Sequence, residues 1–244
     1  MVHTFDPDNP LTGVRAAVRA ALLDQARGVD VARLMCRACV ELLPVDGASV
    51  SLMTTTDDRQ VVYASDAVIE HVEALQFSLG EGPCFEAFQT RRPVLVPDLA
   101  TAAAPAWPLF AAELAGHPVR AIFAFPLQFG AIRIGAMDLY RHTPGWLPPS
   151  FVGVALQAVD IATVALLAAQ SGASDELSDP GWANLRLHRE QVHQATGMVM
   201  AALHIPAAAA LARLRGYAFA AGRLVDEVAL DLVDRRLSPL DLDQ

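Results

Sequence analysis

The chain has 244 residues, of which 53% are hydrophobic and 18% are charged, and its formal net charge is −9. This composition excludes a disordered or collagen-like chain, and the acidic balance argues against a protein that binds nucleic acid over its whole surface. The length is comfortable for two domains with well-filled cores.

The charge is distributed unevenly along the chain. Residues 1–182 hold 11 arginines and 20 acidic residues, whereas residues 183–223 hold five arginines and one acidic residue. The C-terminal part therefore opens with a basic stretch, which is the only part whose charge favours an anionic partner. Three cysteines are too few for a disulfide framework, and no secretory signal is recognisable, so we expect a cytoplasmic protein.

The first elements in chain order are two helices. Residues 1–30 form an N-terminal segment with a helix over 11–27 that ends near Gly28. Asp30 is the expected N-cap of a second helix that runs through Leu43 and is stopped by a proline.

The next elements alternate between strands and helices. Period-2 alternation, β-forming residues and turn signals predict the following elements: strands over 48–53 and 60–64, a short helix over 66–75, a glycine-containing loop over 79–99 with one short strand in "PVLV", paired strands over 119–127 and 132–141, and a long helix from Pro149 to about 170. The pattern predicts an α+β domain, with a mixed antiparallel sheet and helices on one side.

The stretch from Phe151 to Ala169 nearly reaches the length of a membrane span. Asp160 near its centre and Gln157 make insertion costly, so we expect no membrane association. A helix this apolar is expected to be buried against its own domain and against a second copy. The sequence thus predicts a homodimer formed by 149–170 together with 11–27.

Two stretches of this region resemble a known family. "LGEGPCFEAFQTRRPVLVPDL" (79–99) and "FPLQFGAIRIGAMDLYR" (125–141) are similar to the GAF sensory domains found in actinobacterial regulators, and the resemblance covers about 31–170. Members of that family bind cyclic nucleotides, haem, tetrapyrroles or nothing known. The resemblance implies a sensor or dimerisation module. No cofactor is assigned, and an unidentified small-molecule ligand of this domain stays open.

A polar stretch over 171–181, rich in small residues and marked by proline and glycine, predicts a linker before a second domain at 182–244. This domain is expected to be all-α, with three helices over 182–204, 206–221 and 224–237. Pro206 suits the first turn of the second helix, and Gly222 suits its end.

The stretch "QATGMVMAALHIPAAAALARLRGYAFAAGRLVDEVALDLV" (194–233) is similar throughout to the ANTAR family, the three-helix RNA-binding module of transcription antitermination regulators. The matching positions are Ala195 and Gly197 in the first helix, Leu214, Arg215, Tyr217 and Ala218 in the second, and Val228 and Ala229 in the third. The resemblance implies a three-helix bundle that binds RNA hairpins, downstream of a GAF sensor.

The chain departs from the ANTAR pattern at several positions. Thr196 and Gly216 stand where basic residues are usual, and Ala208 and Ala209 stand where acidic residues are usual. Because RNA affinity depends largely on phosphate neutralisation, the two missing cations leave weaker or partner-assisted RNA binding open.

Gly197 lies near the middle of a predicted helix, where glycine costs about 1 kcal/mol relative to alanine. Two interpretations stay open: close packing of another helix, or approach of a nucleotide to a bare backbone. In the second helix, Arg213 and Tyr217 share one stripe, which suits either phosphate binding with base stacking or a solvated arginine beside a half-buried tyrosine. The predicted RNA-binding residues are Arg186, Arg189, His193, Thr196, Gly197, Arg213, Tyr217 and Arg223. Arg215 is expected instead to serve packing or an intramolecular ion pair.

The sequence offers little support for catalysis or metal binding. Cys36 and Cys39 have CxxC spacing but fall inside a predicted helix, where structural burial is favoured. Cys84 is placed by Gly82 and Pro83 on an exposed turn, which makes it the better candidate for a reactive thiol, although packing is favoured there too. Since the histidines are scattered and no nucleophile–base set is recognisable, we assign no catalytic residue and no metal, and expect the protein not to be an enzyme.

The sequence therefore predicts a signal-responsive regulator whose C-terminal domain binds RNA hairpins to control transcription termination. Two alternatives from other classes stay open. One is a DNA-binding transcription regulator, although the third helix carries four acidic residues before its two arginines. The other is a redox-responsive GAF protein. The ligand, the RNA target and the direction of the response are not encoded in any recognisable motif.

Overall fold

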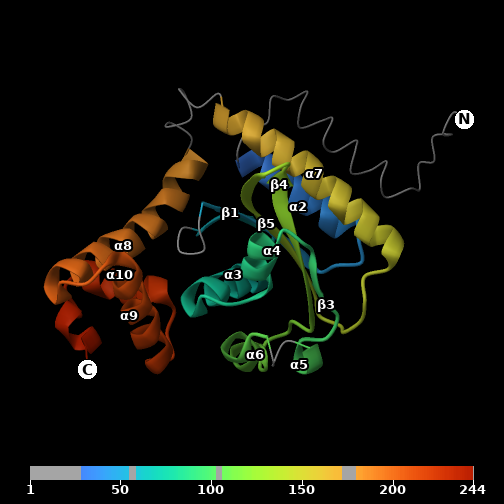
Figure 1. Ribbon diagram of the computed structural model, residues 1–244. Helices are drawn as coiled ribbons and strands as arrows, with labels where there is room; N and C mark the ends of the chain where they lie inside the picture. Colours follow the sequence, from blue (N-terminus) through green and yellow to red (C-terminus); the bar gives the residue numbers. More distant parts are fainter. Residues whose placement is uncertain (1–28, 55–58, 103–105, 172–179, 244) are drawn as a thin grey trace, which may run out of the picture.

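The computed structural model describes residues 29–54, 59–102, 106–171 and 180–243, without the side chains of 102 and 168–189. The expected helix over 11–27 and most of the expected linker lie outside the described residues. The described chain forms two units side by side: a sheet covered by helices, and a group of C-terminal helices (Figure 1).

The sheet of the first unit has five strands in the order β2-β1-β5-β4-β3. Every neighbouring pair is antiparallel. The strands are β1 (Gly47–Met53), β2 (Arg59–Ala64), β3 (Val94–Val96), β4 (Ala121–Phe129) and β5 (Ile132–Arg141). All five predicted strands are therefore confirmed, and the two longest pair at the centre as expected.

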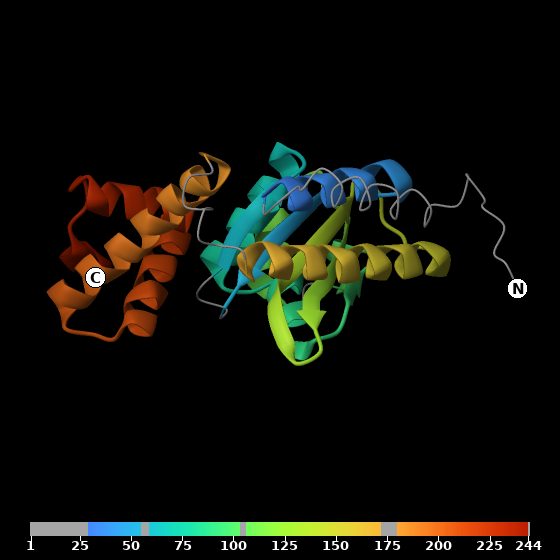
Figure 2. The same cartoon turned by 90° about the horizontal axis from the view of Figure 1, so that it is seen from above.

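Helices cover both faces of the sheet, which corrects the expectation of helices on one side only. On one face, α2 (Val29–Leu42) and α7 (Pro149–Ser171) lie side by side (Figure 2). The other face carries α3 (Ala67–Leu79), α4 (Pro83–Thr90), α5 (Leu99–Ala102) and α6 (Pro108–Leu114). The continuous apolar run of β4 is the sequence signal for this arrangement, because a strand covered on both faces need not alternate.

Local chemistry sets several helix boundaries differently from the expectation. Val29 and Asp30 already lie inside α2, so Asp30 is not its N-cap and instead pairs with Arg33 within the first turn. The expected loop over 79–99 contains α4, which begins at Pro83, because proline fits the first helical position without losing a hydrogen bond. The start of α3 is set by Asp66, whose carboxylate accepts two backbone N–H groups.

The long helix α7 packs along β4 and α2. Its segment Pro149–Leu167 is long and apolar enough to cross a membrane by length and composition alone. Within the protein, its inner residues Val154, Ala158 and Ala162 are buried in the main apolar core. The α7 side chains therefore contribute directly to the core of the first unit.

The second unit consists of α8 (Pro180–Leu203), α9 (Ala207–Ala220), α10 (Val225–Val233) and the 3₁₀ helix η2 (Pro239–Asp243). These elements share one apolar core, in which Val199, Leu214 and Val228 are fully buried. We call this unit the C-terminal bundle. Pro206 caps α9 from outside rather than lying in its first turn, and Gly222 follows the helix with a φ of 61°, as the expected stop signal does.

Candidate functional site

Seven polar side chains are buried between the sheet and the helices α3 and α4, and we call them the buried polar cluster. They are Ser49 and Ser51 of β1, Arg59 of β2, Glu73 and Gln76 of α3, Cys84 of α4 and Asp138 of β5. Strand alternation explains the position of the serines, because the intervening Ala48 and Val50 point into the apolar core on the opposite face.

The centre of the cluster is an ion pair between Arg59 and Glu73, each about 1% exposed at its side chain. The Glu73 carboxylate also accepts hydrogen bonds from the hydroxyls of Ser49 at 2.5 Å and Ser51 at 3.1 Å. The Arg59 guanidinium donates to the main-chain carbonyl of Glu73 at 2.8 Å. The buried negative charge of Glu73 is thus compensated by a charge and several donors, as burial requires.

Asp138 lies next to this pair and is linked to α3 and α4 by Gln76. The Gln76 amide donates to Asp138 Oδ2 at 2.8 Å, and its carbonyl oxygen accepts from the Cys84 backbone N–H at 2.8 Å. Burial raises the pKa of Asp138, although Arg59 and the hydrogen bonds from Gln76 and Cys84 oppose this shift. Asp138 Oδ1 has no hydrogen-bond partner among the described residues. The site therefore favours the protonated carboxyl more than an exposed aspartate would.

Cys84 does not lie on an exposed turn, contrary to the expectation. It is the second residue of α4 and fully buried, and burial raises the pKa of its thiol to about 12. Cys36 and Cys39 lie inside α2 as expected, and burial likewise raises the pKa of both thiols, that of Cys39 to about 12. Since the thiolate is the reactive form, these three sites count against the redox-responsive alternative.

The cluster also brings three potential metal ligands together. Donor atoms of Glu73, Cys84 and Asp138 all lie within 4.8 Å of one another. These residues are far apart in the sequence, so local spacing gave no indication of them. Arg59 already supplies a positive charge to Glu73, and the Cys84 thiol favours its protonated form. The donor set therefore fits a hydrogen-bonded network of this chain better than a cation.

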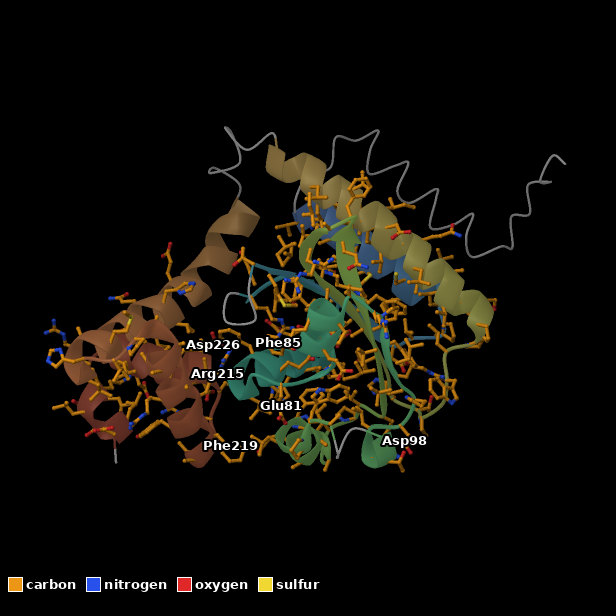
Figure 3. The ribbon with its side chains drawn as sticks, viewed as in Figure 1. Glu81, Phe85, Asp98, Arg215, Phe219 and Asp226 are labelled. Carbon is orange, nitrogen blue, oxygen red and sulfur yellow. The ribbon has the colours of Figure 1, made fainter. Side chains whose placement is uncertain are left out.

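The end of α3 joins the two units. The Arg215 Nε of α9 donates to the carbonyl of Phe77 at 3.1 Å, and its guanidinium lies 5.3 Å from the centre of the Phe77 ring (Figure 3 shows Arg215 at this boundary). The Val225 backbone N–H donates to the Ser78 hydroxyl at 3.0 Å in a buried bond. Gly80, with a φ of 68°, ends α3 directly against Arg215. Arg215 thus serves packing within the chain, as expected.

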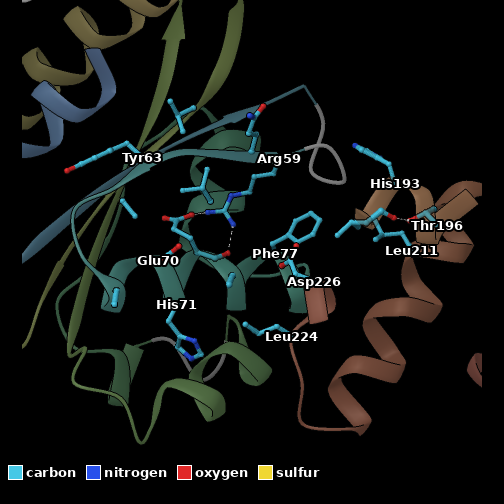
Figure 4. A pocket seen from close by; sticks show the side chains of 18 of the residues that line it. Arg59, Tyr63, Glu70, His71, Phe77, His193, Thr196, Leu211, Leu224 and Asp226 are labelled. Atoms are coloured by element: carbon cyan, nitrogen blue, oxygen red, sulfur yellow. Dashed lines mark hydrogen bonds and ion pairs between the residues drawn. The ribbon is translucent and has the colours of Figure 1, made fainter. Parts of the chain in front are cut away.

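A cleft of about 1120 Å³ lies between the two units. One wall is formed by β2 and α3, with Tyr63, Glu70 and Phe77, and the other by α8, α9 and the start of α10, with His193 and Leu211 (Figure 4). We call it the inter-unit cleft. Because α3 also carries Glu73 and Gln76, the same helix connects the buried polar cluster to this cleft and to the C-terminal bundle.

The predicted RNA-binding residues of α8 occupy different environments. The side chains of Arg186 and Arg189 lie outside the described residues, although their backbone belongs to α8. His193 is exposed at the inter-unit cleft. Thr196 lines the same cleft but is only 9% exposed, and its hydroxyl donates to the carbonyl of Val192 at 2.7 Å. That hydroxyl is engaged inside the helix.

Gly197 is exposed, and a Cβ added to it would meet no atom within 4 Å. This geometry excludes the packing interpretation among the described residues, since no other helix approaches the bare backbone. Met200, three residues further along α8, packs against the core of the bundle. Gly197 is therefore a helix-interior glycine without a packing contact to the described part of the chain.

The predicted residues of α9 and the following turn are tied to acidic neighbours. Exposed Arg213 pairs with Asp243 of η2. Arg223 pairs with Asp231 at 2.8 Å and approaches Glu227 at 3.7 Å. Tyr217 is half-buried against the bundle core, so the expected open stripe of Arg213 and Tyr217 is only partly exposed. The i,i+4 spacing of Arg223 and Glu227 was a signal for one of these pairs.

The fold is an antiparallel five-stranded sheet between two helical layers, with a polar cluster under α3 and α4. Residues 29–167 match the family model described as GAF domain, which covers more than half of the chain. The chain belongs to the GAF domain family, a family of sensor and signalling domains.

Solved structures agree with this fold. The chain is similar to the GAF domain of an Acinetobacter phosphoenolpyruvate-protein phosphotransferase, with a TM-score of 0.55 and 13% identity over 68% of this chain and 96% of that one. For the GAF domain of the corresponding protein from Coxiella burnetii, the TM-score is 0.52 and the identity is 12%, over 67% of this chain and 98% of that one. For the chromophore-binding domain of a bacteriophytochrome from R. palustris, the TM-score is 0.51 and the identity is 10%, over 68% of this chain and 64% of that one. No curated protein matches the chain.

Proposed function

We propose that this protein is a cytoplasmic, homodimeric regulator in which the GAF unit senses a signal and the C-terminal bundle binds RNA hairpins to control transcription termination. It is not an enzyme in this proposal. The GAF membership supports the sensor part. The direct contact of α3 with α9 and α10 supports communication between the two units, because a displacement of α3 would alter its hydrogen bonds with Arg215 and Val225.

The observation that carries the RNA-binding part is Gly197. It lies in the interior of α8, is exposed and faces open space, so its cost of about 1 kcal/mol relative to alanine has no compensation among the residues that the structure describes. A partner that approaches the helix backbone closely would supply the compensation. A nucleotide of an RNA loop is such a partner, since its phosphate and sugar need room next to the helix.

The predicted RNA-binding residues Arg213 and Arg223 are available to RNA only at the expense of their ion pairs. Arg213 pairs with the exposed carboxylate of Asp243 and Arg223 with the partly exposed carboxylate of Asp231, and ion pairs at the surface are weak, on the order of 1 kcal/mol or less. Phosphates can therefore compete for these guanidinium groups. The competition predicts a modest, strongly salt-dependent affinity.

Homodimer formation is proposed through α7. Its outward surface exposes Leu156 and Val164, which are 38% and 52% exposed, with Asp160 between them one helical turn from each. Large apolar side chains on an exposed helix surface favour association. Sedimentation that shows a monomer at micromolar concentration would remove this part of the proposal and leave the RNA-binding part untouched.

The decisive experiment measures binding of the full chain to short RNA hairpins and to matching DNA duplexes over a range of salt concentrations. Gly197→Gln should keep or raise stability while abolishing hairpin binding, because the side chain fills the space that the RNA backbone needs. Ala212→Gln, at an exposed position of α9, is the matched control and should bind as wild type. Hairpin binding by a folded Gly197→Gln variant at wild-type affinity would show that the proposed face is wrong, and preferential binding to the duplex would favour the DNA-binding alternative.

Substitutions of Arg213 and of Asp243 should have opposite effects on hairpin binding in the same assay. Arg213→Ala should weaken binding to all hairpins and flatten the salt dependence, since a phosphate contact carries no sequence information. Asp243→Asn should strengthen binding, because it releases Arg213 from its ion pair. Tyr217→Ala should cost about 1–3 kcal/mol if the ring stacks on a base.

A further inference from the structure

The inter-unit cleft belongs to neither unit alone. Its volume of about 1120 Å³ is slightly larger than that of most small-molecule sites, and such sites occur preferentially where two domains meet. It lies on the strand β2 and the outward side of α3, and it shares Arg59 and Glu73 with the buried polar cluster beneath the same helix. The cleft is therefore a second candidate site that adjoins the cluster.

The walls of the cleft are largely apolar on both sides. Val61, Ala74 and Phe77 line it from the GAF unit, and Val192 and Leu211 line it from the C-terminal bundle. Tyr63 adds a second aromatic side chain to the GAF wall. Surfaces of this kind suit a ligand with a flat apolar body, which buries area against both walls at once.

The charged side chains of the cleft are mostly acidic. Four lining residues are carboxylates, namely Asp66, Glu70, Glu73 and Asp226, and one is an arginine, Arg59. The Arg59 charge is taken up by Glu73 in their buried pair. His71 on the rim does not add a positive charge, because burial and the neighbouring His117 lower its pKa. The lining therefore repels anions and attracts cations.

We propose that the inter-unit cleft binds an organic cation with a flat aromatic body. Its positive group lies near the exposed Glu70 carboxylate, and its ring system lies between the walls carrying Phe77 and Leu211. Cation–π attraction to the aromatic side chains adds to the carboxylate contact. Since the ligand contacts both units, it stabilises their docked arrangement, which links occupancy of the cleft to the position of the C-terminal bundle.

The test uses the full chain and two fluorescent probes, 9-aminoacridine as a flat aromatic cation and 8-anilinonaphthalene-1-sulfonate as an aromatic anion. Saturable one-to-one binding of the cation, and weaker binding of the anion, is the expected result. Glu70→Gln, which keeps the size of the side chain, should lower the affinity for the cationic probe by about two- to fivefold, since a single exposed ion pair is weak. Absence of saturable cation binding, or stronger binding of the anion, would overturn the proposal.

Three tryptophan substitutions locate the probe. Ala67 on α3 and Ala208 on α9 are exposed and line opposite walls, so Ala67→Trp and Ala208→Trp should each lower the affinity about tenfold or more by filling the cleft. Ala209→Trp, exposed but outside the lining, is the matched control and should bind as wild type. Unchanged affinity in both cleft variants, with far-ultraviolet circular dichroism confirming their fold, would show that the cation binds elsewhere. This assay contains no RNA, so its outcome is independent of the proposed RNA binding.

Discussion

The two units of the molecule stabilise charged groups in opposite ways. The GAF unit buries an ion pair and several hydrogen-bonded polar groups between its sheet and α3. The C-terminal bundle has an almost entirely apolar core, with Thr196 as its one buried polar side chain among the described residues, and keeps its arginines and carboxylates paired at the surface. The difference means that charges are compensated in the interior of the GAF unit and at the surface of the bundle.

This contrast has an energetic consequence. Removing one member of a buried ion pair leaves an uncompensated charge inside the protein, which is costly. Removing one member of an exposed pair returns the other to water at little cost. The chain contains both a buried and an exposed ion pair. Substitutions in the two units therefore compare the cost of breaking a buried ion pair with the cost of breaking an exposed one.

The largest expected effect is that of Glu73→Leu. It leaves Arg59 buried without its carboxylate, so the free energy of unfolding should fall by about 3–5 kcal/mol. Urea denaturation checks this, and the double variant Arg59→Met/Glu73→Leu should recover much of the loss. Asp243→Asn in the bundle is the matched comparison and should change stability by less than about 1 kcal/mol. Equal losses in the free energy of unfolding for Glu73→Leu and Asp243→Asn would contradict the difference between buried and exposed ion pairs.

Asp138→Asn tests whether the cluster holds a proton. Because the pKa of Asp138 is raised in the folded state, its protonated form stabilises the fold fully at low pH, and this stabilisation is lost as pH rises from about 4 through the folded-state pKa. Asparagine can still accept the Gln76 hydrogen bond. The variant should therefore gain stability relative to wild type as pH rises, measured by denaturation between pH 4 and 8. A pH-independent difference would mean that Asp138 titrates normally.

Arg215→Met tests whether Arg215 couples the unfolding of the two units. It removes a hydrogen bond from a charged, half-buried group to Phe77 while keeping most of the side-chain volume. We expect a loss of about 1–2 kcal/mol and partial separation of the unfolding transitions of the two units. Scanning calorimetry measures both. A single unshifted transition would show that Arg215 does not couple them.

Gly197→Ala should give a small change in stability, and this change has the opposite sign. The added Cβ meets nothing within 4 Å, so only the gain in helix propensity remains, about 1 kcal/mol of added stability. Thermal unfolding detects it as an increase in the melting temperature. Destabilisation would mean that the backbone at Gly197 is packed in solution.

Much of the fold follows from local sequence patterns. Alternating residues, β-formers and turn signals predicted the five strands, because these patterns depend on residues close together in the sequence. Prolines and glycines located the ends of the C-terminal helices to within a few residues. The helix α4 was missed because a stretch opened by glycines and proline reads locally as a loop, while its hydrophobic contacts to the sheet lie far along the chain.

The candidate sites divide in the same way. Local patterns were enough to identify the GAF family of the first unit, the helical nature of the second, and the basic character of residues 183–223. The burial of Cys84, the pairing of Glu73 with Arg59, the acidic partners of Arg213 and Arg223 and the open space beside Gly197 became visible in the folded chain alone. The physical reason is that charge compensation and burial depend on residues that the fold brings together over long sequence distances, whereas helix and strand periodicity depends on near neighbours.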